Sequence, residues 1–168
     1  MEKTLVILKP DALQRGIAGE IITRFEKAGL KIVASKMIRP NREHYYKHYE
    51  DIGQMVSRRG KEAFDVTLEM MQMGPVLVMV LEGIEAISLV RKMVGTTEPK
   101  SAAPGTIRGD YAHMSFAYAD AQHTGIPNLI HASGDASDAK KEIGHWFADN
   151  EIFEYKATHE YYTQTKKE

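Results

Sequence analysis

Hydrophobic positions along the chain fall into runs typical of strands and repeats typical of helices. Short apolar runs predict strands at 4–8, 30–38, 76–81 and around 129–130. Apolar residues at helical spacing predict helices at 17–28, 61–73, 84–94 and from Asp135 onward, and Asn41 can cap a further helix to about Tyr49. The unbroken apolar run 76–81 indicates a central strand buried on both faces. Loops or irregular structure are expected at 51–60, 96–106 and 111–127.

The order of these elements predicts an α/β chain of the α+β type. It favours a ferredoxin-like split βαβ arrangement, with a four-stranded, mainly antiparallel sheet covered by helices. A doubly wound parallel sheet fits less well, because one helical hairpin would be left over. The sequence shows no repeat and no linker, so residues 1–168 are expected to form a single domain.

Composition narrows the classes of function. The content of 43% hydrophobic and 27% charged residues is ordinary for a soluble globular protein, and the net charge of −1 provides no global basic field for nucleic acid or anionic lipid. The absence of cysteine excludes thiol catalysis, disulfides and cysteine-ligated zinc. No apolar block resembles a signal peptide or a membrane span. We therefore expect a cytoplasmic protein without a membrane partner.

The stretch 128–142 carries the first candidate for chemistry. A short strand end delivers His131, small residues follow it, and a helix then begins at Asp135. A histidine at a strand exit, with Ser133 and Glu142 nearby in sequence, is a candidate nucleophile or general base. A single histidine can equally be a surface residue or a satisfied core group, so this stretch alone leaves both interpretations open.

Three cations outside that stretch could form a phosphate site. Lys9 directly follows the first strand, Arg91 lies in the last turn of a predicted helix, and Arg108 follows a loop rich in Pro, Gly and Thr. Each alone is an ordinary surface cation, but together with the loop hydroxyls they would suit a polyphosphate. Neither G-x-x-x-x-G-K-[ST] nor G-x-G-x-x-G occurs, so nucleotide binding would rely on side chains. His44 and His48 are four residues apart, but they lack the H-E-x-x-H pattern, and no protein metal site is expected.

Together these pieces resemble the nucleoside diphosphate kinase family over nearly the whole chain. The motifs that carry the resemblance are, in order, TLVILKPD (4–11), RGIAGEI (15–21), MGPV (73–76), LEG (81–83), GTTEP (95–99), PGTIRGD (104–110), NLIHAS (128–133) and EI (142–143). The set in this order is far more specific than any single member.

The resemblance implies ping-pong transfer of the γ-phosphate of a nucleoside triphosphate to a nucleoside diphosphate. It makes His131 the residue that is phosphorylated, with Ser133 and Glu142 orienting its ring and Tyr49 packed near it. It places Lys9 near the γ-phosphate and the ribose hydroxyl, and Asn128 at the ribose 3′-hydroxyl.

The resemblance also assigns the remaining substrate contacts and the cofactor. Arg91, Thr97 and Arg108 match the set that contacts the phosphates. Phe64 is the candidate aromatic that stacks on the base. Stacking discriminates poorly between bases, so nucleoside triphosphates and diphosphates of several kinds, such as ATP and GTP, are expected substrates. Mg²⁺ is expected to be held mainly by the nucleotide phosphates, and the family's dimers assemble into hexamers or tetramers.

Three departures from the family pattern stand out. The segment between Tyr49 and Pro75 is longer than usual, with an altered loop at about 50–62. Extra residues are inserted at about 111–127, and the usual His-Gly-Ser-Asp-Ser reads His-Ala-Ser-Gly-Asp from His131. These changes leave open a regulatory homologue that binds nucleotide with little or no turnover. A nucleic-acid-binding module is the least favoured alternative, since the central strand is aliphatic and the net charge is slightly negative.

Overall fold

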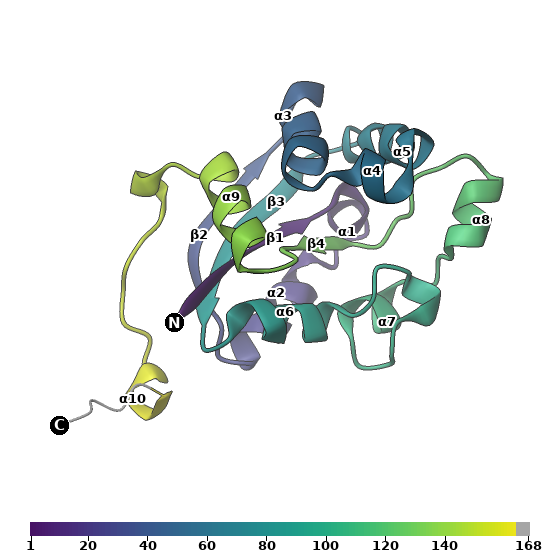
Figure 1. The fold of residues 1–168 in the computed structure, drawn as a ribbon. Helices are drawn as coiled ribbons and strands as arrows, with labels where there is room; N and C mark the ends of the chain where they lie inside the picture. Colours follow the sequence, from purple (N-terminus) through teal and green to yellow (C-terminus); the bar gives the residue numbers. More distant parts are fainter. Residues whose placement is uncertain (164–168) are drawn as a thin grey trace.

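A four-stranded antiparallel sheet forms the centre of the protein (Figure 1). The structure is a computed structural model and describes residues 1–163. Its strands are β1 (Glu2–Leu8), β2 (Lys31–Ile38), β3 (Val76–Gly83) and β4 (Ile130–Ala132), in the order β2-β3-β1-β4. Every neighbouring pair is antiparallel, which confirms the predicted sheet.

Helices cover both faces of the sheet (Figure 1). The α-helices are α1 (Pro10–Gln14), α2 (Ala18–Lys27), α3 (Arg42–Tyr46), α4 (Met55–Arg59), α5 (Lys61–Met71), α6 (Ala86–Val94), α7 (Ile107–Tyr111), α8 (Phe116–Ala121), α9 (Ala136–Trp146) and α10 (Glu160–Thr163). A π-helical turn at Lys47–Ile52 and 3-10 turns at Pro99–Ser101 and Asp149–Glu151 complete the set. The predicted caps are present: Asn41 accepts a hydrogen bond from the His44 amide, and Asp135 accepts one from the Asp138 amide.

Alternate residues of the central strands fill two separate cores. On β1, Val6 and Leu8 join the core beneath α2 and α6, whereas Leu5 and Ile7 join the core beneath α3, α5 and α9. All four side chains are fully buried. Because successive side chains of a strand point to opposite faces, a strand covered on both sides needs an unbroken apolar run. This accounts for the apolar runs seen in the sequence at β1 and β3.

The pairing of β1 with β4 brings together residues that lie far apart in the sequence. Ile7 lies opposite His131, and the Lys9 amide donates to the Leu129 carbonyl oxygen at 2.8 Å. Residues more than 100 positions apart in the chain thus meet at one end of the sheet. The ends of the central strand β1 and the edge strand β4 bring Lys9 and His131 to the same end of the sheet.

Two segments expected to be irregular contain helix. The segment 51–60 contains the end of the π-helical turn and α4, where the Val56 amide donates to the Glu50 side chain at 2.8 Å. The segment 111–127 contains α8, which Ser115 caps by accepting from the Tyr118 amide. Both helices are too short to show apolar periodicity, and their ends are fixed by side-chain hydrogen bonds.

A short helix, α1, begins directly after Lys9 at the end of β1. Pro10 occupies the first position of α1, where its missing amide hydrogen is not needed. Among residues 1–163, no helix combines the length and apolar character that crossing a membrane requires.

Candidate active site

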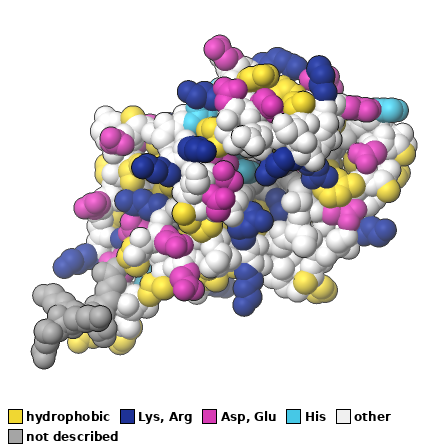
Figure 2. Space-filling view, in the orientation of Figure 1, with side chains coloured by type: hydrophobic (Ala, Val, Ile, Leu, Met, Phe, Trp, Pro, Cys, Tyr) yellow, Lys and Arg dark blue, Asp and Glu magenta, His cyan; other side chains and the backbone are white. Residues whose placement is uncertain are grey.

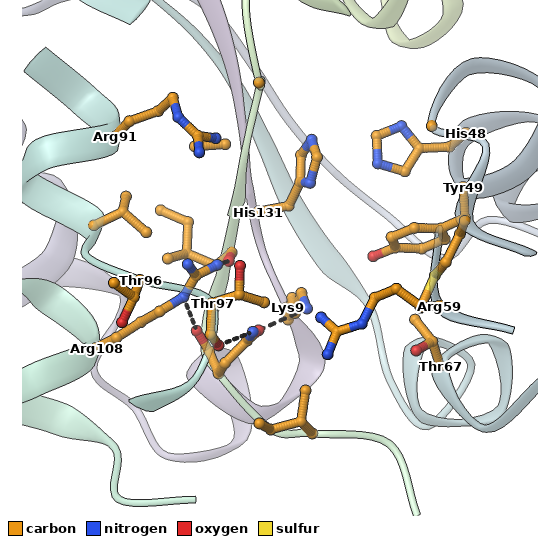
Figure 3. A pocket seen from close by; sticks show the side chains of 18 of the residues that line it. Lys9, His48, Tyr49, Arg59, Thr67, Arg91, Thr96, Thr97, Arg108 and His131 are labelled. Carbon is orange, nitrogen blue, oxygen red and sulfur yellow. Dashed lines mark hydrogen bonds between the residues drawn. The ribbon is translucent and has the colours of Figure 1, made fainter. Parts of the chain in front are cut away.

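A cavity of about 500 Å³ opens at the joined ends of β1 and β4 (Figure 3). Figure 2 shows Lys and Arg side chains gathered around the hollowed middle of this face. The basic side chains that line the cavity are those of Lys9, Arg58, Arg59, Arg91 and Arg108. The acidic ones are Asp138 and Glu142. This excess of positive charge suits a polyanionic ligand, although the chain as a whole carries a net charge of −1.

His131 lies at the centre of the cavity, and its ring orientation is fixed by Glu142. The His131 Nε2 atom is 2.9 Å from a Glu142 carboxylate oxygen, and the second oxygen accepts from the Ser133 hydroxyl at 2.6 Å. Ser133 is in turn tied to β1, because its oxygen accepts from the Leu5 amide. A carboxylate can only accept here, so Nε2 carries the proton and Nδ1 keeps a lone pair.

The electrostatics of Glu142 favour its ionised form. Burial alone would raise its pKa, but the charge of His131 and the hydrogen bonds from His131 and Ser133 lower the pKa from 4.5 to about 2. The carboxylate is therefore ionised across the physiological range. It stabilises positive charge on the His131 ring, as a histidine nucleophile requires.

His48, whose spacing from His44 indicates at most a weak metal site, is also a residue of this cavity. Its ring packs edge-on against His131, with centroids 4.6 Å apart, and is 1% exposed. Trp146 donates its indole hydrogen to His48 Nδ1 at 3.1 Å. No pattern in the sequence indicates this role, because the Trp146 bond that orients the His48 ring comes from a residue 98 positions away.

Tyr49 contributes a hydroxyl without a partner. Its oxygen is buried and makes no hydrogen bond among the described residues, although the side chain lines the cavity. Burial, the largest cause, raises the Tyr49 pKa, so the hydroxyl remains a donor. A ligand oxygen in the cavity would satisfy it.

Lys9 is a buried cation at the floor of the cavity. It is 6% exposed, and its ammonium donates to the Asn128 side-chain oxygen at 2.7 Å. The Asn128 amide donates in turn to the Thr97 carbonyl oxygen at 2.9 Å. Burial and then the charge of Arg108 lower the Lys9 pKa from 10.5 to about 8. Burial has removed most of the water around this ammonium group, so an anion bound beside it would be strongly attracted.

Arg108 and Arg91 line the side of the cavity formed by α6 and α7. Arg108 is 7% exposed and donates to the carbonyl oxygens of Gly95, Asn128 and Ile130. These bonds fix the two loops that carry Thr97 and Asn128. Burial and the nearby charge of Arg91 lower the Arg108 pKa to about 10, which leaves it charged at neutral pH.

Phe64 requires a correction. Its side chain is 4% exposed, belongs to the core beneath α5 and packs edge-on against Tyr46. It is not among the residues that line the cavity. The expected stacking of a base on Phe64 is therefore wrong for this structure, because helical spacing directs the ring into the core. The other expected site residues either line the cavity or, like Ser133, hold one that does.

One set of side chains has the composition of a metal site. Donor atoms of His48, His131 and Glu142 lie within 4.8 Å of one another. Existing hydrogen bonds use these groups, however: Trp146 occupies His48 Nδ1, so the neutral ring carries its proton on Nε2 and has no free lone pair there. His131 and Glu142 bond each other, so these side chains serve one another in preference to an ion.

Comparison with known proteins agrees with this geometry. The profile of the family described as nucleoside diphosphate kinase matches residues 2–152. The chain belongs to the nucleoside diphosphate kinase family. A nucleoside diphosphate kinase of Pyrococcus horikoshii is 51% identical over 154 residues, covering 92% of this chain and 90% of the relative. One from Borreliella burgdorferi is 45% identical over 158 residues, covering 93% of each. Membership supports the expected kinase activity.

Solved structures agree as well. A Borrelia burgdorferi nucleoside-diphosphate kinase, described as a transition-state mimic with bound vanadate and ADP, has a TM-score of 0.92 at 44% identity and covers 95% of this chain and 94% of its own. A halophilic nucleoside diphosphate kinase from Halobacterium salinarum in complex with CDP has a TM-score of 0.82 at 36% identity, covering 98% and 99%. The expected fold is thus confirmed.

Proposed function

We propose that this nucleoside diphosphate kinase transfers phosphate through a phosphohistidine on His131. The observation that carries the proposal is the bond from His131 Nε2 to Glu142, which leaves Nδ1 without a hydrogen-bond partner among the described residues, in a cavity lined by five basic side chains. This geometry suits a nucleophile whose positive charge is stabilised by a carboxylate at the other nitrogen of its ring. It is less typical of a structural histidine, which would have both nitrogens bonded.

The proposed reaction has two half-steps. His131 Nδ1 attacks the γ-phosphorus of a nucleoside triphosphate; a nitrogen–phosphorus bond forms while the bond to the β,γ-bridging oxygen breaks, and its electron pair leaves with the diphosphate. Glu142 accepts the Nε2 hydrogen bond throughout and stabilises the charged ring. A second nucleoside diphosphate then attacks the phosphohistidine with a terminal oxygen, and the ring recovers its lone pair.

The remaining residues have positioning and charge-neutralising roles in this proposal. Lys9 and the Tyr49 hydroxyl donate to the transferred phosphate, and Arg91 and Arg108 neutralise the others with Thr97. Asn128, already bonded to Lys9, is placed to meet the ribose hydroxyl. Such arrangements suit phosphoryl transfer, which depends mostly on positioning and neutralisation of spread negative charge.

Mg²⁺ is the proposed cofactor, held mainly by the nucleotide. The cavity lining fits this role, since its two carboxylates, those of Asp138 and Glu142, do not form an acidic cage and Glu142 is already bonded to His131. When bound, Mg²⁺ supplies charge neutralisation on the phosphates. The phosphate oxygens that it leaves free would meet the basic side chains.

Labelling tests the proposal. The protein is mixed with γ-labelled ATP and Mg²⁺ without acceptor, then chased with GDP. We expect acid-labile, alkali-stable label that moves to GDP, and no label on His131→Ala. His113→Ala, made at an exposed histidine outside the cavity lining, should label like the wild type. Label on His131→Ala would refute the assignment, and nucleotide binding without any label in the wild type would favour the regulatory homologue.

We also propose that the chain forms a homo-oligomer, a hexamer or tetramer. Among the described strands β2 pairs with β3 alone, and although the Phe153 amide and the Tyr155 hydroxyl bond the Val33 and Ile32 carbonyls, the rest of its outer edge is open to a strand of another chain. Light scattering on the eluted protein would show the assembly, and a monomer at micromolar concentration would refute it. The cytoplasmic location and the single domain over 1–168 remain predictions from the sequence.

A further inference from the structure

Away from His131, the described residues that line the cavity offer a base no aromatic ring. The aromatic side chains in the described cavity lining are His48, Tyr49 and His131, which contact one another at the catalytic end. The lining contributed by α4, α5 and the residues before β4 includes Met55, Arg58, Arg59, Thr67, Met70 and Ile126. We call this set the outer wall. Arg58 and Arg59 are its planar, charged groups, and of the two Arg59 packs on an aromatic ring.

The Arg59 guanidinium packs on an aromatic side chain of the segment 111–127, that of Phe116. Its guanidinium carbon is 3.9 Å from the centroid of the Phe116 ring, although the two residues come from α4 and α8. Figure 3 shows the Arg59 guanidinium directed into the cavity, where its charge contributes to lowering the Lys9 pKa. Lys9 bonds Asn128, the residue proposed to contact the ribose. A base attached to that ribose would therefore extend beyond Lys9 to the outer wall.

Independent contacts hold Phe116 in place. Its amide donates to the Glu98 carboxylate at 2.9 Å at the start of α8. At the other end of the segment, His123 Nδ1 lies 2.7 Å from a Glu62 oxygen. The ring behind Arg59 thus belongs to a segment that is anchored on both sides.

Gly125 gives this segment a third, tighter contact. A methyl group added to Gly125 would lie 2.8 Å from the Val66 carbonyl oxygen and 2.9 Å from Met70 Cβ. Backbone of the segment therefore packs directly on α5. The two segments that depart from the family pattern, about 50–62 and 111–127, together with α5 make one structural unit at the outer wall.

We propose that Arg59 binds the nucleobase by stacking, with Phe116 covering the opposite face of its guanidinium. Planar guanidinium groups stack on both aromatic side chains and bases, and every base offers a π-face. The charge–ring stack replaces the single aromatic expected at Phe64. It also gives the segment 111–127 a part in substrate binding. This inference rests on the proposed function of the cavity.

The test separates the base from the phosphates. Phosphoenzyme formation is timed with ATP and with ribose 5-triphosphate, which keeps the sugar and phosphates but lacks a base. Arg59→Lys retains the charge and loses the planar group. We expect its second-order rate constant to fall about tenfold or more with ATP, within the range that base stacking contributes, and to be unchanged with ribose 5-triphosphate.

Variants of α8 provide the matched comparison. Phe116→Leu should show the same base-dependent loss, smaller in size, and the double variant Arg59→Lys, Phe116→Leu should lose less than the product of the two. Tyr118→Leu, on the same helix but 59% exposed and outside the cavity lining, should match the wild type.

Two outcomes would overturn the proposal. Equal losses with both donors would mean that Arg59 contacts phosphate or supports the fold, and no loss would mean that the base lies elsewhere. Failure of the proposed function itself looks different, because neither donor would then phosphorylate the wild-type protein.

Discussion

Replacing Lys9 by methionine should stabilise the protein while removing its activity. Lys9 is 6% exposed, and burial with the charge of Arg108 lowers its pKa from 10.5 to about 8. The folded protein therefore holds this proton less tightly than the unfolded chain does. The resulting destabilisation is fully present below pH 8 and disappears as the pH rises from about 8 to 10.5.

The magnitude follows from the size of the shift. A difference of about 2.5 pKa units at about 1.4 kcal/mol each corresponds to about 3 kcal/mol at pH 7, which falls to about 1 kcal/mol at pH 10. The advantage of Lys9→Met over the wild type should therefore shrink by about 2 kcal/mol between these pH values. The variant also leaves the Asn128 side-chain oxygen without its Lys9 donor, which costs about 1–3 kcal/mol of stability, but this cost is the same at pH 7 and at pH 10.

Urea unfolding followed by the fluorescence of Trp146, the single tryptophan, measures this difference. Other groups titrate over the same range, but they are common to both proteins and cancel. Lys100→Met, made at an exposed lysine, controls for the introduction of methionine. A difference between Lys9→Met and wild type that stays constant from pH 7 to 10 would refute the reasoning. The variant should also form phosphoenzyme far more slowly, because it loses the cation proposed to bind the transferred phosphate.

Three further predictions concern the carboxylate behind the nucleophile and the anchored segment. Glu142→Gln keeps the shape but removes the charge bonded to His131, so quench-flow should show phosphorylation slowed about 10- to 100-fold with nucleotide affinity retained; an unchanged rate would contradict the role. Because the Glu142 pKa is lowered from 4.5 to about 2, its stabilisation is present above pH 4.5 and is lost as the pH falls toward 2; acid unfolding of Glu142→Gln should therefore be less steep over that range than in the wild type. Gly125→Ala should destabilise by about 1–3 kcal/mol through its clash with the Val66 carbonyl oxygen and with Met70, whereas Gly144→Ala on α9, with nothing within 4 Å, should be neutral or stabilising; equal melting temperatures for the two variants would argue against tight packing.

The sequence determined the sheet because its strands are buried on both faces. A strand that packs against two layers must be apolar at every position, so 4–8 and 76–81 were visible without any knowledge of their partners. The caps at Asn41 and Asp135 were equally local, since each side chain bonds an amide three residues ahead. Ordered motifs then indicated the family, and with it His131 and its neighbours in the site.

The tertiary structure decided what depends on distant contacts. His48 belongs beside His131 only because Trp146 of α9 fixes its ring, and no spacing in the chain reports that bond. Phe64 faces the core and not the cavity, a choice made by packing around α5. Arg59 packs on Phe116, which lies 57 positions later in the sequence, and neither segment shows hydrophobic periodicity. Local hydrogen bonds and burial patterns are written in the sequence, whereas the neighbours of a buried or bridging side chain are set only when the whole chain has closed.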